Sequence, residues 1–172
     1  MAQCCLVVQH GRRSAREARL TVVFGEAPLP VTNDPDTAGF WLAAERGEVA
    51  VCVCANCGAV LHLPRSHCHI CRSWTVEWKP VAPAGRLMSW TVAEHQVHPA
   101  FPVPYTVVLV ELDDAPEVRL AGHLRGRPEL TAGMPMRADF VTRPGSVTLV
   151  NWRPEVAHCR ISAHGSPPGR TI

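Results

Sequence analysis

Two cysteine pairs of identical spacing constrain this chain more than any other feature. Two residues separate Cys54 from Cys57, two separate Cys68 from Cys71, and ten residues lie between the pairs. This spacing lets both sulfurs of a tight turn face one ion, and two such turns on neighbouring hairpins complete a tetrahedron of thiolates. The pattern therefore predicts a metal site of the zinc-ribbon type with these four cysteines as ligands.

The ligand set also indicates which metal is held and for what purpose. Soft sulfur ligands in a tetrahedron select zinc or iron. Four protein ligands leave no position open for water, so we expect one structural Zn²⁺, with iron as the substitute. Such an ion can contribute an apparent ~10–16 kcal/mol to folding, which would explain how a short segment folds with little core of its own.

Several neighbouring residues offer alternatives to this ligand set. His67 or His69 could replace one cysteine, and either pair could be redox-active, although redox motifs usually occur singly beside a βαβ pattern. Cys52 precedes Cys54 by two residues and is expected on the opposite face of the strand.

The residues that follow each cysteine pair differ between the two turns. Gly58 follows the first pair and accepts backbone angles that a side chain resists. Arg72 stands at the equivalent place after the second pair, and we expect it to make that turn less ideal while leaving the ligands intact.

Helix signals precede the cysteines. Asp34 is a good N-cap, Pro35 suits the first helical position, and Gly47 is a ready C-terminal stop. We therefore predict a helix over residues 35–46. Its apolar stripe, which contains Phe40 and Trp41, should pack on a later element.

Short apolar and alternating runs occupy most of the chain after this helix. They predict strands, in chain order, at 49–54, 59–63, 74–78, 86–95, 104–112, 117–124, 135–142 and 146–153. The proline-rich stretch at 80–85 reads as a joint between the third and fourth of these. The last five, with little helix between them, indicate a small closed barrel, so the fold class is mainly β.

These features divide the chain into four parts. We expect an N-terminal extension at 1–30, a helix with a zinc ribbon at 31–80, a barrel at 81–157 and a C-terminal tail at 158–172. One strand is expected inside the extension, at 20–24.

Composition limits the compartment and the partners. The sequence has no apolar run of the ~18 residues that a membrane span needs, and its start does not resemble a secretory signal. Its eight cysteines are then better read as thiols in the cytoplasm. Seventeen Lys and Arg against fifteen Asp and Glu give a net charge of +2 and a pI near 8.2. That pI is short of the value above about 9 that marks nucleic-acid binders.

No catalytic constellation stands out. The sequence lacks a glycine-rich phosphate loop, a G-x-S-x-G elbow and an H-E-x-x-H motif. Glu94 and His95 are adjacent and would point to opposite faces of a strand, and His98 lies in a proline-rich loop. We therefore assign no catalytic residue and expect no activity from the chain alone.

The order of several motifs resembles a known family. In sequence they are Phe40-Trp41, Arg46-Gly47-Glu48, the two cysteine pairs, Pro64-Arg65, Trp78, Gly85-Arg86-Leu87, Pro104-Tyr105, Val110-Glu111-Leu112 and Gly133-Met134-Pro135-Met136. Over residues 28–142 the chain is similar to the acyl-CoA-associated proteins of bacteria and archaea. In those proteins a rubredoxin-like zinc ribbon precedes a C-terminal OB-fold.

The resemblance implies a five-stranded OB-fold barrel and an accessory role. Members partner thiolases, lipid-transfer-type thiolases and aldolases, or hotdog-fold hydratases, and acyl-CoA would lie at the shared interface. Any catalytic cysteine and histidine would then belong to the partner, and the loop at 96–104 is our hypothesis for the docking surface. No CoA ligand is assigned. Candidate cations are Arg65, Arg86, Arg125 and Arg127.

Two other classes stay open. Ribbons and OB-folds also bind single-stranded nucleic acid, although few aromatic residues and almost no lysine are available for it here. An independent metalloenzyme would require an open position on the metal.

Overall fold

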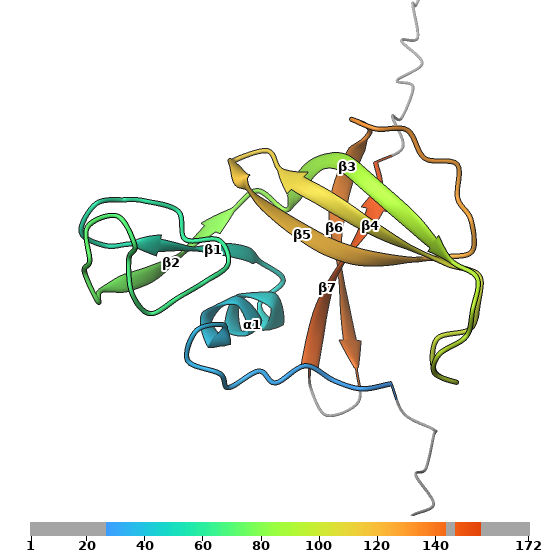
Figure 1. Cartoon of the computed structure of the whole chain (residues 1–172), viewed down its shortest axis with the longest axis horizontal. Coiled ribbons are helices and arrows are strands. Elements are labelled where there is room, and N and C mark those ends of the chain that lie inside the picture. The colour runs from blue at the N-terminus through green and yellow to red at the C-terminus, as the bar shows by residue number, and fades with distance from the viewer. Residues whose placement is uncertain (1–26, 144–146, 156–172) are drawn as a thin grey trace, which may run out of the picture.

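The computed structural model describes residues 27–143 and 147–155, which form one helix and seven strands (Figure 1). The bounds of these elements are α1 (Ala38–Glu45), β1 (Val49–Cys54), β2 (Val76–Val81), β3 (Ala84–Ala93), β4 (Tyr105–Leu112), β5 (Ala115–Arg125), β6 (Pro135–Arg143) and β7 (Val147–Pro154). The ribbon with β1 and β2 projects to one side of the larger sheet, and α1 packs against β1 and β7.

The strands form two antiparallel sheets. β1 pairs with β2, and the other five follow the order β5-β4-β3-β6-β7. The two ends of this order also meet, because the backbone N–H of His123 on β5 donates to Asn151 Oδ1 on β7 at 3.1 Å. The five strands therefore curl into a barrel, and the predicted mainly β class with one N-terminal helix is confirmed.

The helix begins later than its predicted bounds of 35–46. The backbone carbonyl of Asp34 accepts the N–H groups of Thr37 (3.0 Å) and Ala38 (2.7 Å), and Asp34 Oδ1 accepts the N–H of Asp36 (2.9 Å). These bonds hold a turn in front of α1, so Asp34 organises the approach to the helix rather than capping it directly.

The helix ends where the glycine predicted it would. Gly47 has a left-handed backbone with φ of +73°. Its N–H donates to the carbonyl of Ala44 (2.9 Å), and the N–H of Glu48 donates to the carbonyl of Ala43 (3.0 Å). This pair of bonds is a Schellman motif, which satisfies the last free carbonyls and turns the chain into β1.

Most strands lie where the alternation predicted them. β1 has the predicted bounds, and each barrel strand shifts by no more than two residues at either end. The ribbon differs more. No strand forms at 59–63, where a single bridge joins Val53 to Val60. β2 starts at Val76 and ends at Val81, two residues into the expected joint at 80–85.

All six residues of β1 are buried, and its two faces enter different clusters. Val49, Val51 and Val53 pack in the core of the barrel, whereas Cys52 and Cys54 pack in the cluster of the ribbon. The expectation that Cys52 points away from Cys54 is wrong, because side chains two residues apart share one face of a strand.

Several expectations lie outside the described residues: the strand at 20–24, most of the extension at 1–30 and the tail at 158–172. Within the part of the chain that is described, no helix has the length and apolarity needed to cross a bilayer.

Candidate metal centre

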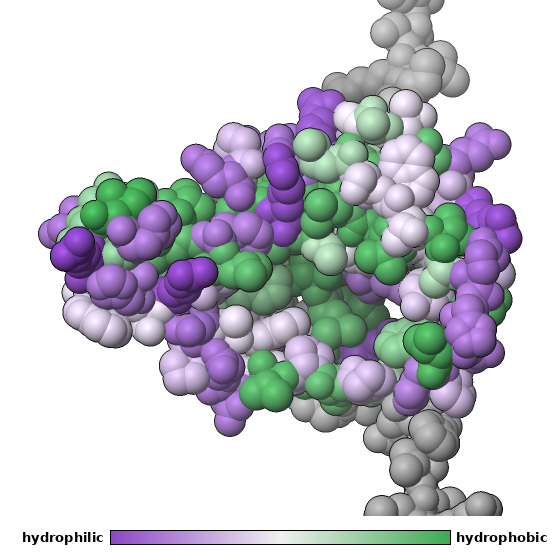
Figure 2. All heavy atoms as spheres, in the orientation of Figure 1, coloured by the Kyte–Doolittle hydropathy of each residue, from purple (hydrophilic) through white to green (hydrophobic). Residues whose placement is uncertain are grey.

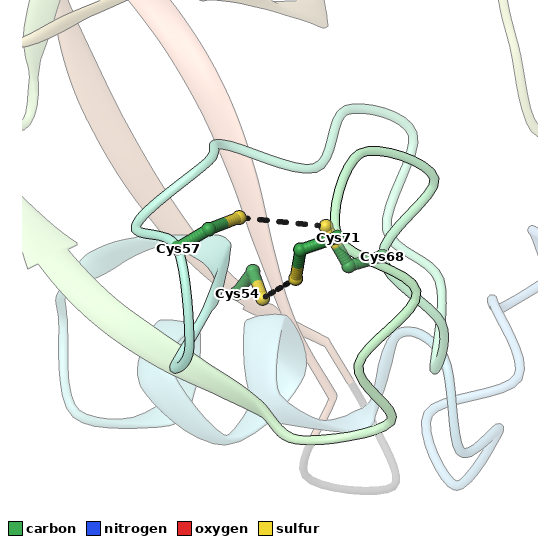
Figure 3. Close-up of side chains that lie close together, drawn as sticks. All are labelled: Cys54, Cys57, Cys68 and Cys71. Carbon is green, nitrogen blue, oxygen red and sulfur yellow. Dashed lines mark hydrogen bonds between the residues drawn. The ribbon is translucent and has the colours of Figure 1, made fainter.

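Four sulfurs meet at the tip of the ribbon (Figure 3). Cys54 ends β1 and Cys57 follows in the first turn, while Cys68 and Cys71 come from the second turn. All four Sγ atoms lie within 4.8 Å of one another. Cys54 Sγ is 3.4 Å from Cys71 Sγ, and Cys57 Sγ is 3.7 Å from Cys68 Sγ.

These distances suit one ion better than a disulfide. Zn–S bonds of about 2.3 Å in a tetrahedron place the sulfurs about 3.8 Å apart. A disulfide would require about 2.0 Å between the two sulfurs. The four cysteines chosen from the spacing are thus brought together in a geometry that can hold a metal ion.

The two turns that carry the sulfurs have the same backbone geometry. Gly58 donates its N–H to the carbonyl of Cys54 (2.8 Å), and Arg72 donates its N–H to the carbonyl of Cys68 (2.9 Å). Both donors have a left-handed backbone, with φ of +73° at Gly58 and +63° at Arg72. Among the residues that the structure describes, Arg72 is the one with a side chain at positive φ.

A second bond completes each turn in the same way. The N–H of Cys54 donates to the carbonyl of Ala59, and the N–H of Cys68 donates to the carbonyl of Ser73, both at 2.9 Å. The repeated pattern gives the two pairs a matching shape, so each presents its sulfurs to the same point.

When no metal is bound, the thiols of Cys57, Cys68 and Cys71 have pKa values that are shifted in different directions. A hydrogen bond from the Asn56 side chain is the main cause that lowers the pKa of Cys71 to about 6, and the backbone N–H of Cys71 lowers the pKa of Cys68. For Cys57 the N–H of Ala59 lowers the pKa, but hydrogen bonds with the other three sulfurs, together with burial, outweigh it and raise the pKa to about 12. A cation among the sulfurs would displace the remaining protons.

The histidine alternatives do not join this cluster. Among the described His, Cys, Asp and Glu residues, the group that could hold a metal consists of the four cysteines. His67 instead packs on Trp74, with ring centroids 4.6 Å apart. Cys52 is buried beside the cluster but outside it.

Glu94, the acid of the cluster at 94–98, is paired with an arginine. Glu94 Oε2 accepts a hydrogen bond from Arg127 Nη2 at 2.6 Å. His98 packs on Phe101, whose ring also packs on Tyr105. The loop is therefore fastened to the barrel through its aromatic rings.

The four candidate arginines do not converge. Arg86 lies 3.6 Å from a carboxylate oxygen of Asp113, and Arg127 pairs with Glu94. Arg125 ends β5, whereas Arg65 lines a cleft in the ribbon. The sequence analysis did not single out this cleft, although its walls all come from residues 61–69. It also missed the apolar cavity beside the cleft, whose walls come from segments that are distant in sequence.

Comparison with known proteins agrees with this architecture. Residues 78–141 match the family described as ChsH2, C-terminal OB-fold domain. The solved structure titled "Ltp2-ChsH2(DUF35) aldolase" is similar with a TM-score of 0.66 and 32% sequence identity, over 73% of this chain and 98% of that one.

Two curated relatives are named as hydratase subunits. The "Probable enoyl-CoA hydratase alpha subunit" of Thermomonospora curvata is 34% identical over 131 residues, 75% of this chain and 40% of the relative. The "3-oxo-4,17-pregnadiene-20-carboxyl-CoA hydratase alpha subunit" of Mycobacterium tuberculosis is 28% identical over 132 residues, 76% of this chain and 41% of the relative. The chain spans about two fifths of the length of these relatives.

The fold and the cysteine cluster define a protein class in which a four-cysteine ribbon precedes an OB-fold barrel. Within that class the chain belongs to the ChsH2 (DUF35) family. The family resemblance predicted from the order of the sequence motifs is confirmed.

Proposed function

We propose that this chain is a non-catalytic accessory subunit that binds a thiolase-like enzyme, either a lipid-transfer-type thiolase or an aldolase, and helps it handle an acyl-CoA substrate. The observation that carries the proposal is the likeness to the structure titled "Ltp2-ChsH2(DUF35) aldolase". The match covers 98% of the chain compared in that structure, at 32% sequence identity.

The proposal includes one structural Zn²⁺ held by Cys54, Cys57, Cys68 and Cys71. Thiolates at these spacings suit zinc, and four of them close the coordination sphere. The ion would supply no chemistry to the substrate and would fix the two turns that the cysteines share. Residues 31–80 would then form the metal-holding module and residues 81–157 the barrel.

The barrel face and the loop at 96–104 are the proposed docking surface. Three apolar side chains of the loop and the neighbouring strands are well exposed: Trp90 (40% exposed), Val97 (76%) and Val107 (37%). Phe101 packs on Tyr105 and on His123, so the loop is held on the barrel in the free chain. Little ordering of the loop would then be needed on binding.

Capture from the native cell tests the partner. The tagged full chain should retain a thiolase-like enzyme, identified by mass spectrometry. The variants Val97→Glu and Val107→Glu should lose that enzyme because each places a charge in an apolar contact. Val31→Glu is the matched control, since Val31 is 69% exposed but lies before α1, away from the loop. Recovery of no enzyme of CoA metabolism would contradict the accessory role.

A second candidate partner is a hotdog-fold hydratase. It is favoured by the names of the two curated relatives, each a hydratase alpha subunit. The same capture distinguishes the two, because a hydratase chain would be retained in place of a thiolase-like one. Hydration of an enoyl-CoA by the captured complex, but not by the chain alone, would favour this alternative.

A further inference from the structure

An apolar cavity of about 150 Å³ lies where the ribbon meets the barrel. Its walls include Phe40 and Trp41 of α1, Val51 of β1, Trp78 of β2, and Val118 and Leu120 of β5. Figure 2 shows apolar residues gathered at this junction. Because the elements of both modules contribute, the cavity exists only when ribbon and barrel are packed together.

A second, more polar cleft adjoins the cavity. Its walls are Leu61, His62, Leu63, Arg65 and His69, and its volume is about 300 Å³. The segment 61–63 lines both spaces and forms their common wall. An apolar space and a polar space are thus placed side by side.

The charge in the cleft is positive. Arg65 lines it, carries a permanent charge and forms no ion pair with any residue in the described part of the chain. No carboxylate is among the residues that line the cleft. The carboxylate of Asp36, which reaches the same loop, accepts the backbone N–H of Ser66 at 2.9 Å.

His62, in the common wall, lies next to β5 of the barrel. Burial lowers the pKa of its ring, and the backbone of Arg119 on β5 opposes that shift. Arg119 itself is paired with Glu111, with 3.1 Å between Nη2 and Oε2. Because Arg119 is paired with Glu111, Arg65 is the guanidinium left at the cleft to meet a ligand.

We propose that cavity and cleft form one binding site for an amphiphilic anion, with a small apolar group in the cavity and a phosphate or carboxylate on Arg65. His62 and His69 supply further hydrogen-bonding groups at the cleft. The inference goes beyond the accessory role and does not depend on it, since the site is formed by this chain alone.

The volume sets the size of the apolar group. A cavity of about 150 Å³ lined by apolar side chains accepts a molecule the size of benzene. A ring or chain of about six carbons therefore fits, whereas a long acyl chain would extend beyond the cavity.

Calorimetric titration of the zinc-loaded full chain tests the site. The probes are hexyl phosphate and hexanoate, with inorganic phosphate and 1-hexanol as the two halves of the ligand. One of the amphiphiles should bind at least tenfold more tightly than either half, and which of them does so identifies the anion. Amphiphiles that bind no better than their halves would overturn the proposal.

Two variants separate the parts of the site. Arg65→Gln should weaken the better amphiphile at least tenfold by removing its charged partner. Arg153→Gln, the same charge change on β7, should leave binding unchanged. Leu120→Trp should fill the cavity and weaken the amphiphile while inorganic phosphate is unaffected.

A structural readout covers the case in which Leu120→Trp does not fold. In the unaltered protein, nuclear Overhauser contacts from the hexyl chain should reach the indoles of Trp41 and Trp78. Contacts confined to other side chains would place the ligand elsewhere and overturn the site.

Discussion

Gly58 and Arg72 occupy equivalent positions in the two cysteine turns and share a left-handed backbone, with φ of +73° and +63°. The first turn has the residue suited to this conformation, and the second bears the cost of a side chain there. A left-handed conformation costs a residue with a Cβ about 1–2 kcal/mol.

Substitution at these two positions should therefore give unequal effects. Gly58→Ala should lower the free energy of unfolding of the zinc-loaded chain by about 1–2 kcal/mol in urea titrations. Arg72→Ala is the matched control and should change the free energy of unfolding by less than about 0.5 kcal/mol. Arginine and alanine both have a Cβ, so the left-handed backbone costs either residue about the same at position 72. Equal losses at both sites would show that the strain argument is wrong.

Removal of one sulfur should remove the metal. Cys68→Ala leaves three ligands, so the protein should lose its zinc on dialysis against a chelator, while the unaltered chain keeps one ion. Cys52→Ala is the control, because Cys52 is equally buried but lies outside the sulfur cluster. Metal analysis by mass spectrometry measures both, and zinc retained by Cys68→Ala would contradict the ligand set.

The contact between Gly39 and Trp78 should not tolerate a methyl group. A Cβ at Gly39 would overlap the indole of Trp78, so Gly39→Ala must displace α1 from β2. We expect a loss of about 1–3 kcal/mol in the free energy of unfolding. In combination with Trp78→Leu the added cost should shrink, because the smaller side chain leaves room. Strictly additive losses would count against this contact.

Acidification should destabilise the fold partly through His123. Burial, followed by the charges of Arg125 and Arg143, lowers the pKa of His123 below 6.5. Among the described residues its buried Nε2 also has no hydrogen-bond partner. Burial lowers the pKa of His62 as well. The unfolded chain takes up these protons more readily, so the free energy of unfolding should fall as the pH drops below about 6.5.

The variant His123→Gln isolates this contribution. Its free energy of unfolding should fall less steeply between pH 7.5 and 5.5 than that of the unaltered chain. Zinc content is measured at each pH, because protonation of the thiolates also releases metal. Identical slopes at equal zinc content would exclude a role for His123.

The sequence could predict the features that depend on neighbours in the chain. The two-residue spacing of the cysteines encodes a local turn, and Gly47 ends α1 because only its own backbone angles matter. The barrel strands followed from runs of apolar and alternating residues, and the alternation is clearest in β4, where every second residue is buried. The face of Cys52 was predicted wrongly because alternation places residues two apart, such as Cys52 and Cys54, on the same face of a strand.

Features that depend on long-range packing could not be predicted. Residues 59–63 have the composition of a strand, but the pairing with β1 is limited to the single bridge between Val53 and Val60. Two backbone bonds flank that bridge, from the N–H of Cys54 to the carbonyl of Ala59 and from the N–H of Leu61 to the carbonyl of Cys52. Pro64 offers no N–H to continue it. The cavity is likewise invisible in the sequence, because its walls come from segments as far apart as Phe40 and Leu120.

β1 enters the sulfur cluster with one face and the barrel core with the other. Loss of the proposed Zn²⁺ should therefore not release the ribbon alone, because a loosened β1 also removes three valines from the core of the barrel. We expect one cooperative calorimetric transition, whose midpoint moves with zinc concentration. In a cell short of zinc, the whole protein would then unfold, and not only its ribbon.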